Sequence, residues 1–404
     1  MRTTGSCRRT TTSLYSFSIQ LARSILPPMT RYALLKIMAL LPVAVLAQQD
    51  AKEKTFGVEL ASAKSTIGEW HWIPRPDTFC RDGSTTGFGV RLLPDAKGVM
   101  IYLQGGGACY DEQSCAENAG APIAGDNFSQ TKFDVWVDQL GNQGVFNTTH
   151  PSNPVARWNH VYIPYCTGDL HGGVREDAAV PGITGKQQFV GYRNLQNDLK
   201  LLAPFFQEAE DIALVGASAG GVGVLINYPQ VVNAFGGRSV AALVDSAPVI
   251  PESAIKTSCF QHKLIKTFDL RLPASCPDCG DPSKGGLLNI YRHLSETYPN
   301  GRFAFASADA DLAGVILYDR ESRACSGVGV NIFNYRFSLY ALRDKYIGHD
   351  WASYLPGGIQ HTMTQSDALF LDRKYAGISA AEWLGNINSK TPLHVPAARL
   401  QPKK

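Results

Sequence analysis

The chain has 404 residues and a formal net charge of +3, with 44% hydrophobic and 18% charged residues. A chain of this length and apolar content can bury a large core and suits one large domain of mixed helices and strands. Its basic residues form no stripe or cluster, so we expect no nucleic-acid partner.

The first 47 residues have the pattern of an export signal. An apolar stretch follows basic residues, and the letters V-L-A at 45–47 resemble a small-residue cleavage site. The stretch is too short and too interrupted to span a membrane, so we expect no stable membrane anchor. We therefore predict a leader over residues 1–47, with Met29 as an alternative start. Residues 48–404 are predicted to form a single domain of a secreted or periplasmic protein.

A buried strand is expected over residues 98–103, directly before a run of glycines. Its sequence, GVMIYL, is continuously apolar, as is typical of a strand covered on both faces. The glycine run at 105–107 leaves backbone N–H groups free to point into a pocket. We interpret it as an oxyanion-binding loop of the kind found in esterase-type α/β-hydrolases, with Gly106 and Gly107 as donors.

The most informative motif is G-A-S-A-G-G at residues 216–221. The apolar run 211–215 precedes it and the apolar run 222–226 follows it, which predicts strand, sharp turn and helix. Glycines on both sides allow Ser218 to occupy such a turn. The serine hydroxyl would then stand beside the first N–H groups of the helix, including that of Ala219, where negative charge is stabilised. The pattern predicts a nucleophilic serine.

Further elements alternate between strand and helix along the chain. Strands are predicted at residues 160–165, 240–244 and 302–307, and a helix at 192–206. This alternation predicts an α/β fold with a mostly parallel central sheet, flanked by helices, and a site at the carboxyl ends of the strands. Residues 251–299 break the rhythm and carry three cysteines, so we predict a disulfide-tied insertion near the site. The tail from residue 392 is expected to fray.

Eight cysteines follow the leader: Cys80, Cys109, Cys115, Cys166, Cys259, Cys276, Cys279 and Cys325. An even number in an exported chain favours disulfides, although the sequence alone fixes no pairing. A second interpretation rests on Cys259-x-x-His262 followed by Cys276-x-x-Cys279. This spacing is that of zinc ligands and would fit a zinc-dependent deacetylase.

Together the motifs resemble those of the pectin acetylesterase/Notum family of carboxylesterases, over about residues 70–361. The matching segments, in the family's order and spacing, are residues 103–109 with Cys115, 164–169, 191–193, 216–221 and 245–247. The resemblance implies an α/β-hydrolase-like fold and a secreted serine carboxylesterase of bacterial type. We also expect the disulfides Cys109–Cys115 and Cys80–Cys166.

The resemblance implies that late residues complete a catalytic triad. His361 lies in a glycine-rich loop similar to the one that carries the family's histidine, and His349 is the alternative. The acid is predicted to be Asp311, which follows a late strand. Asp309 and Asp245 are the alternatives, because each also follows a predicted strand.

The predicted chemistry is acyl transfer to water. Ser218 would attack an ester carbonyl, His361 would accept and return the proton, and Asp311 would orient the imidazole. This mechanism needs no metal and no organic cofactor. The expected substrate is an acylated, most simply acetylated, carbohydrate or a small ester. A non-catalytic binding protein on a hydrolase scaffold is the alternative.

Three positions depart from the family pattern. Gln104 replaces a glutamate, Ala217 a cysteine, and Ala108 a tryptophan beside the oxyanion loop. Loss of that large aromatic predicts a wider acyl pocket, unless the insertion refills the space with Phe260 or Phe268.

Overall fold

The computed structural model describes residues 60–119, 127–252, 255–389 and 391–400. The predicted leader at residues 1–47 lies outside the described residues, and the single domain over 48–404 stays a prediction.

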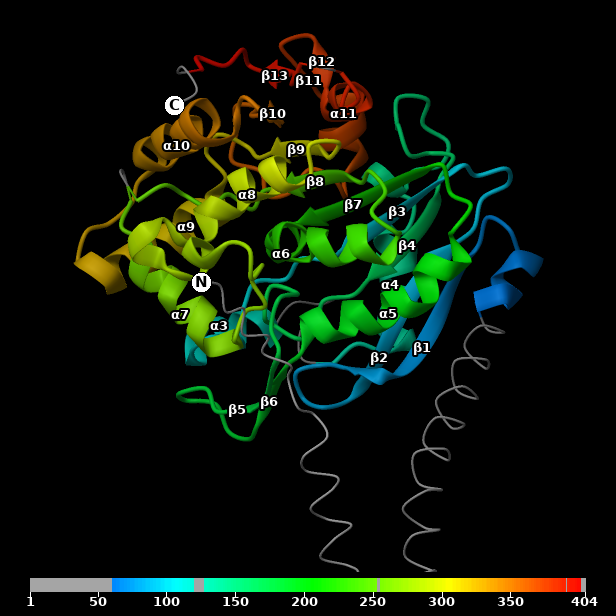
Figure 1. Cartoon of the computed structure of the whole chain (residues 1–404), viewed down its shortest axis with the longest axis horizontal. Helices are drawn as coiled ribbons and strands as arrows, with labels where there is room; N and C mark the ends of the chain where they lie inside the picture. Colours follow the sequence, from blue (N-terminus) through cyan, green and yellow to red (C-terminus); the bar gives the residue numbers. More distant parts are fainter. Residues whose placement is uncertain (1–59, 120–126, 253–254, 390, 401–404) are drawn as a thin grey trace, which may run out of the picture. The chain divides into compact units, whose positions relative to one another are not determined.

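A nine-stranded sheet lies at the centre of the described residues, in the order β1-β2-β4-β3-β7-β8-β9-β10-β13 (Figure 1). Its strands are β1 (Trp70–Phe79), β2 (Thr85–Arg91), β3 (Gly98–Leu103), β4 (Asn159–Ile163), β7 (Asp211–Ala217), β8 (Ala241–Asp245), β9 (Arg302–Ala306), β10 (Trp351–Tyr354) and β13 (His394–Val395). All pairs from β4 to β13 are parallel, whereas β2 pairs antiparallel with both β1 and β4. The predicted α/β class with a mostly parallel sheet is confirmed.

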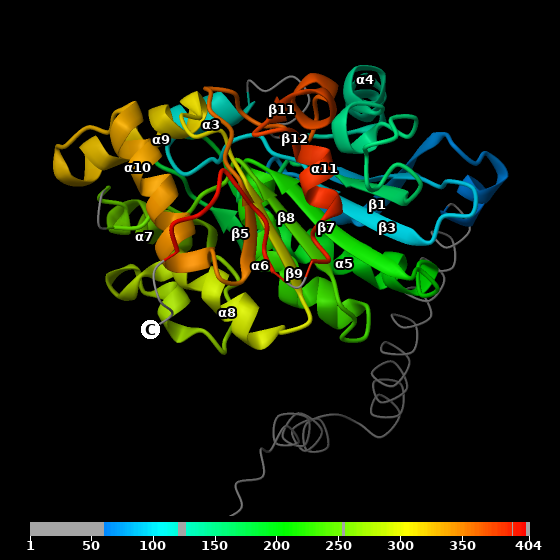
Figure 2. The same ribbon diagram turned by 90° about the horizontal axis from the view of Figure 1, so that it is seen from above.

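Helices cover both faces of this sheet. They are α3 (Glu112–Ala119), α4 (Gln130–Leu140), α5 (Gly191–Phe205), α6 (Ala219–Ala234), α7 (Ser258–Phe268), α8 (Asn289–Thr297), α9 (Leu312–Ser326), α10 (Ile332–Ala341) and α11 (Ala380–Gly385). In Figure 2, α5, α6 and α8 lie on one side of the sheet, and α4 and α11 on the other. Within the described ranges, no helix is long and apolar enough to cross a membrane.

Smaller elements complete the fold. Two short antiparallel pairs are formed by β5 (Arg175–Ala178) with β6 (Gln187–Phe189), and by β11 (Lys374–Tyr375) with β12 (Ile378–Ser379). The short helical turns are η1 (Ala63–Ser65), η2 (Gly144–Phe146), η3 (Pro277–Gly280), η4 (Pro282–Lys284), η5 (Gly286–Leu288), η6 (Leu342–Ile347) and η7 (Asp367–Asp372).

Strand β3 shows why the sequences of the central strands are continuously apolar. Its side chains point alternately to opposite faces, as the period of two requires. Val99 and Ile101 join the core that includes buried side chains of α5, α6 and α8. Met100 and Tyr102 join the second core, with side chains of α4 and α11. Because both faces are covered, every residue of β3 is buried.

Four disulfides tie the described residues together. The expected pairs Cys80–Cys166 and Cys109–Cys115 are confirmed. The other two are Cys259–Cys325 and Cys276–Cys279. The zinc interpretation of Cys259, His262, Cys276 and Cys279 is therefore wrong, because its three cysteines are bonded to other cysteines. No group of three or more His, Cys, Asp or Glu side chains in the described part of the chain could hold a metal.

The segment predicted as an insertion lies between β8 and β9 and forms α7, η3, η4, η5 and α8. The disulfide Cys259–Cys325 joins α7 to α9. The expectation of a frayed tail is wrong at residues 394–395, which pair in parallel with β10 as the last strand of the sheet. Leu355 N–H donates to Val395 C=O at 2.6 Å, and this bond depends on a distant partner that the local sequence does not reveal.

Candidate active site

Ser218 occupies a sharp turn between β7 and α6, with backbone φ 54° and ψ −125°. The flanking glycines are needed because the chain is crowded there. A Cβ on Gly216 would lie 2.2 Å from the carbonyl oxygen of Gly220, and one on Gly220 would lie 2.0 Å from that of Leu103. The Ser218 N–H donates to the carbonyl of Asp245 at 2.8 Å, which fixes the turn against β8. This is the geometry of a nucleophile elbow.

His361 links the serine to a buried carboxylate. Its Nε2 lies 2.9 Å from Ser218 Oγ, and its Nδ1 lies 2.7 Å from Asp311 Oδ2. Asp311 is fully buried, whereas the His361 side chain is 28% exposed. An ionised carboxylate only accepts hydrogen bonds, so Nδ1 carries the proton and Nε2 is left to accept from the serine hydroxyl. The structure thus brings Ser218, His361 and Asp311 together in the arrangement of a triad.

Asp311 has a second contact, at the start of α9. Its Oδ1 accepts from Gly314 N–H at 3.2 Å, so the same carboxylate also caps the helix. The alternative Asp309 faces elsewhere, with Arg336 Nε at 3.0 Å and Gly358 N–H at 3.2 Å. The geometry therefore pairs His361 with Asp311 and not with Asp309, a choice that the sequence left open.

The loops that carry the acid and the histidine run side by side beyond the ends of β9 and β10. Asp309 N–H donates to Pro356 C=O at 2.9 Å, and Leu312 N–H donates to Ile359 C=O at 3.1 Å. These bonds continue the parallel pairing of the two strands. Because the loops are held in this register, Asp311 meets His361 across 50 positions of sequence.

Asp245, the other alternative acid, anchors the histidine loop. Its Oδ2 accepts from the N–H groups of Met363 and Thr364, both at 2.8 Å, and from the Thr364 hydroxyl at 2.7 Å. Its Oδ1 accepts from Ser246 Oγ at 2.9 Å. Burial raises the pKa of this carboxyl, and these hydrogen bonds oppose the rise. No signal in the sequence pointed to Met363 and Thr364 as the partners of Asp245.

The pKa of His361 is raised above its usual range. Burial by itself lowers it, but the hydrogen bond and charge of Asp311, together with the charge of Asp245, outweigh the burial. The imidazolium that forms during acyl transfer is therefore stabilised by two carboxylates. Such a histidine can take up the serine proton and hold it until the leaving group needs it.

The glycine loop after β3 lies against the elbow. A Cβ on Gly105 would lie 2.4 Å from the carbonyl oxygen of Ala217, so this glycine is required for the close approach, a role the sequence interpretation missed. Among the donors predicted from sequence, Gly107 and Ala219 line the same cavity as Ser218. Ala219 opens α6, so its N–H has no partner within the helix and can serve a ligand.

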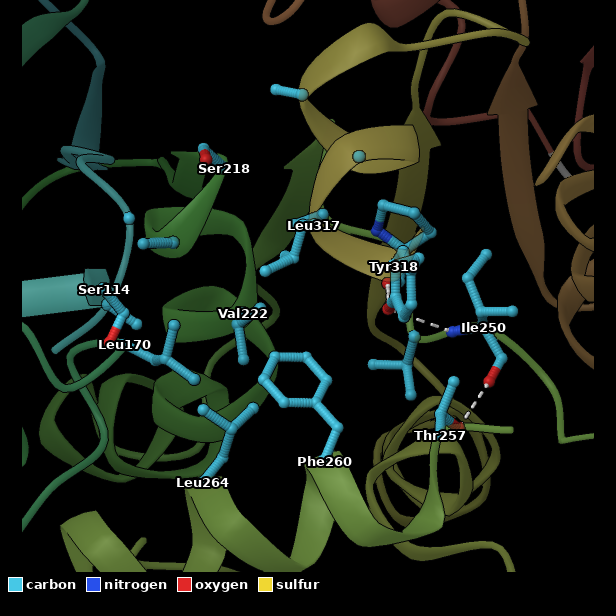
Figure 3. A pocket seen from close by; sticks show the side chains of 18 of the residues that line it. Ser114, Leu170, Ser218, Val222, Ile250, Thr257, Phe260, Leu264, Leu317 and Tyr318 are labelled. Atoms are coloured by element: carbon cyan, nitrogen blue, oxygen red, sulfur yellow. Dashed lines mark hydrogen bonds between the residues drawn. The ribbon is translucent and has the colours of Figure 1, made fainter. Parts of the chain in front are cut away.

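A cavity of about 320 Å³ extends from Ser218 between α6, α7 and α9 (Figure 3). Phe260 and Leu264 of α7 reach into it towards Val222 and Leu317, so its walls are mainly apolar. The full lining is Gly107, Ala108, Tyr110, Ser114, Glu117, Leu170, Ser218, Ala219, Val222, Ser246, Ala247, Pro248, Val249, Ile250, Thr257, Phe260, Gln261, Leu264, Leu287, Ala313, Gly314, Leu317, Tyr318, Arg320 and His361.

Three residues were expected at the wall of this cavity: Ala108, Phe260 and Phe268. Ala108 lines the cavity, as its place beside the glycine loop predicts. Of the two insertion aromatics, Phe260 lines it and packs edge-to-face on Tyr110 at 5.5 Å. Phe268 instead packs against Phe189 at 4.9 Å.

The chain is similar in sequence to a known family and to several named carboxylesterases. The sequence model of the pectinacetylesterase family matches residues 62–272, more than half of the chain. Palmitoleoyl-protein carboxylesterase notum2 of Xenopus laevis is 29% identical over 168 residues, which are 40% of this chain and 32% of that protein. Palmitoleoyl-protein carboxylesterase NOTUM of Drosophila melanogaster is 30% identical over 158 residues, which are 38% of this chain and 22% of that protein. The matches thus span about a third or less of these relatives.

A solved structure has a similar fold. The Wnt deacylase Notum from Drosophila superposes with a TM-score of 0.60 at 22% sequence identity, covering 80% of this chain and 94% of that one. At this level of identity the likeness establishes the α/β-hydrolase-like fold alone.

Proposed function

Because the chain belongs to the pectinacetylesterase family, we propose that it is a secreted serine carboxylesterase that hydrolyses acyl esters. The observation that carries the proposal is the hydrogen-bonded series Ser218, His361 and Asp311 at a nucleophile elbow. The likeness to relatives named as carboxylesterases supports it.

The proposed reaction has two halves. Ser218 Oγ attacks the ester carbonyl while His361 Nε2 takes its proton, and the tetrahedral intermediate collapses as the same proton passes to the departing alcohol. Water then attacks the acyl-enzyme, with His361 again accepting a proton and returning it to Ser218. Asp311 stabilises the imidazolium in both halves and is not itself protonated.

Backbone N–H groups supply the stabilisation of the oxyanion in this proposal. Those of the glycine loop, at Gly106 and Gly107, and that of Ala219 are the donors predicted from sequence. Loss of one such donor typically lowers kcat by about 10²–10³-fold. The helix dipole of α6, which begins directly after Ser218, acts in the same direction.

The acyl group is proposed to occupy the apolar cavity. A cavity of about 320 Å³ lies at the lower end of the range, about 300–1,000 Å³, of pockets that bury drug-sized ligands, so it has room for an acyl chain of several carbons. The acetyl group expected from sequence would fill only a small part of this space. Acyl chains longer than acetyl are therefore the favoured substrates, in line with relatives named for palmitoleoyl esters. The alcohol part of the ester, carbohydrate or other, is proposed to lie on the exposed side of Ser218, outside the cavity.

Export of the protein is part of the proposal. Four disulfides in the described residues suit an oxidising compartment. N-terminal sequencing of protein recovered outside the cytoplasm should find a start near Gln48. Retention of the leader on the exported protein would contradict this part.

A series of p-nitrophenyl esters from acetate to decanoate tests the proposal. We expect kcat/KM to rise from acetate to about octanoate or decanoate, because each methylene added within the cavity removes apolar surface from water. Ser218→Ala should abolish turnover with an unchanged circular dichroism spectrum. Retention of most of the activity by this variant would refute the serine mechanism. Absence of turnover in the wild type would instead favour the alternative of a non-catalytic binding protein.

A further inference from the structure

Two buried side chains hold the carbonyl groups of the glycine loop. Asn118 of α3 donates from Nδ2 to the carbonyl oxygen of Gly106. Tyr165, which follows β4, donates from its hydroxyl to the carbonyl oxygen of Gly107 at 2.9 Å. Asn118 and Tyr165 are both almost fully buried, and neither lines the cavity among the described residues.

Fixing these carbonyls also fixes the N–H groups that follow them. In a planar trans peptide the C=O of one residue and the N–H of the next point in opposite directions. The carbonyl of Gly106 therefore sets the direction of the Gly107 N–H, and the carbonyl of Gly107 sets that of the Ala108 N–H. Gly107 and Ala108 both line the cavity beside Ser218.

We infer that Asn118 and Tyr165 are positioning residues of the oxyanion hole, and that they orient the N–H groups of Gly107 and Ala108 towards the developing negative charge. The inference rests on the proposed esterase function. The inference adds the N–H of Ala108 to the predicted donors. It also makes the Gly106 carbonyl the group through which Asn118 holds the loop. Glycine makes this arrangement possible, since Gly107 has φ 78°.

The Tyr165 side chain and the helix that carries Asn118 are themselves held in place. The Tyr165 hydroxyl also accepts from Leu170 N–H at 2.8 Å, and Tyr165 N–H donates to Gln104 Oε1 at 2.8 Å. Asn118 lies one helical turn beyond Cys115, whose disulfide to Cys109 ties α3 to the end of the glycine loop. The donors are thus fixed before substrate binds, which is the condition under which an oxyanion hole lowers a barrier.

The main test is Tyr165→Phe, with Tyr228→Phe as its matched control. Tyr228 is an equally buried tyrosine whose hydroxyl donates to the carbonyl of Val240 at 2.9 Å, away from the glycine loop. We expect Tyr165→Phe to lower kcat on p-nitrophenyl butyrate by about tenfold, less than removal of a donor would, with KM changed less than twofold. The affinity for butylboronic acid, which forms a tetrahedral adduct on a serine, should fall by a similar factor. Tyr228→Phe should leave kcat and boronate affinity unchanged.

A second variant acts on the other peptide group and guards against misfolding of the first. Asn118→Ala removes the bond to Gly106 and should again lower kcat and boronate affinity with little change in KM. Wild-type kcat and boronate affinity in folded Tyr165→Phe and Asn118→Ala would overturn the inference, as would an equal loss in Tyr228→Phe. If wild-type protein turned over and Ser218→Ala did not, such a result would leave the proposed function standing. Absence of turnover in the wild type would overturn both.

Discussion

The carboxylate of Asp245 accepts two hydrogen bonds from one residue, the N–H of Thr364 at 2.8 Å and its hydroxyl at 2.7 Å. Thr364 lies three positions after His361, and the backbone carbonyl of Asp245 receives the N–H of Ser218. One residue at the end of β8 therefore holds both the nucleophile turn and the histidine loop. The distance between Ser218 and His361 depends on this anchor, although Asp245 contacts neither reacting atom.

Replacing Asp245 by asparagine should damage both stability and activity. The amide keeps one carbonyl oxygen for the three donors of Met363 and Thr364 and turns its NH₂ group to the Ser246 hydroxyl, but the negative charge is lost. Hydrogen bonds to a charged group are worth about 1.5–3 kcal/mol each, whereas neutral ones are worth about 0.5–1.5 kcal/mol. We expect the free energy of unfolding to fall by about 3–5 kcal/mol in urea and kcat to fall more than tenfold. Thr364→Val, which removes only the hydroxyl, should show a smaller loss of about 1 kcal/mol. Equal stability of Asp245→Asn and wild type would contradict the anchoring role.

The activity should depend on the protonation of His361. The histidine must be neutral to accept the serine proton, so activity is lost as the pH falls through its pKa. Because that pKa is raised above 6.5, we expect the acidic limb of kcat/KM to have its midpoint above pH 6.5. A profile measured from pH 5 to 9 checks this.

Asp311→Asn should move that acidic limb to lower pH. The substitution removes the hydrogen-bonding carboxylate and its charge, so the pKa of His361 falls. Asparagine still caps α9 well, so the fold should be retained while kcat drops by up to about 10⁴-fold, as in comparable triads. Asp309→Asn is the matched control, because Asp309 does not contact His361. An acidic limb that stays in place in Asp311→Asn would argue against the triad.

Ala108→Trp should narrow the acyl site. Ala108 lines the cavity beside the glycine loop, and tryptophan brings roughly 150–250 Å² of side-chain surface into that space. We expect turnover of the octanoyl ester to fall much more than that of the acetyl ester, which serves as the internal control. A preference unchanged within about twofold, roughly 0.4 kcal/mol, would show that this position does not limit the acyl group.

The insertion aromatic Phe260 should act in the opposite sense. Phe260→Ala enlarges the cavity and should shift the optimum of the ester series towards longer chains. Phe268→Ala is its matched control, since both side chains lie on α7 and are buried but only Phe260 lines the cavity. Each variant should lose about 3–5 kcal/mol of stability, and only the first should change chain-length preference. A similar shift in both variants would mean that the effect is on folding and not on the cavity.

The central strands could be predicted because burial on both faces makes their sequences continuously apolar. Residues 98–103 and 303–306 show this pattern and lie in β3 and β9. The edge strands could not be predicted in the same way. β1 contains two prolines, and β13 has only two residues, so their pairing depends on neighbours distant in the sequence.

In the site, too, some features depend on residues that are contiguous in the sequence, and others depend on contacts between distant segments. The elbow at Ser218 is a local motif, because its glycines, strand and helix are contiguous. The choice between Asp309 and Asp311 depends on the register between the loops after β9 and β10. The contacts of Asp245 with Thr364 and of Tyr165 with Gly107 likewise join loops that only the folded sheet brings together.

The central claim is that Ser218 is the nucleophile of an esterase, and covalent trapping tests it most directly. The protein is treated with a p-nitrophenyl alkylphosphonate, the residual esterase activity is measured, and the modified peptide is identified by mass spectrometry. We expect one adduct per chain, on the peptide that contains Ser218, with activity lost in proportion to labelling and no labelling of Ser218→Ala. Full inactivation without modification of Ser218, or undiminished hydrolysis by fully modified protein, would contradict the account.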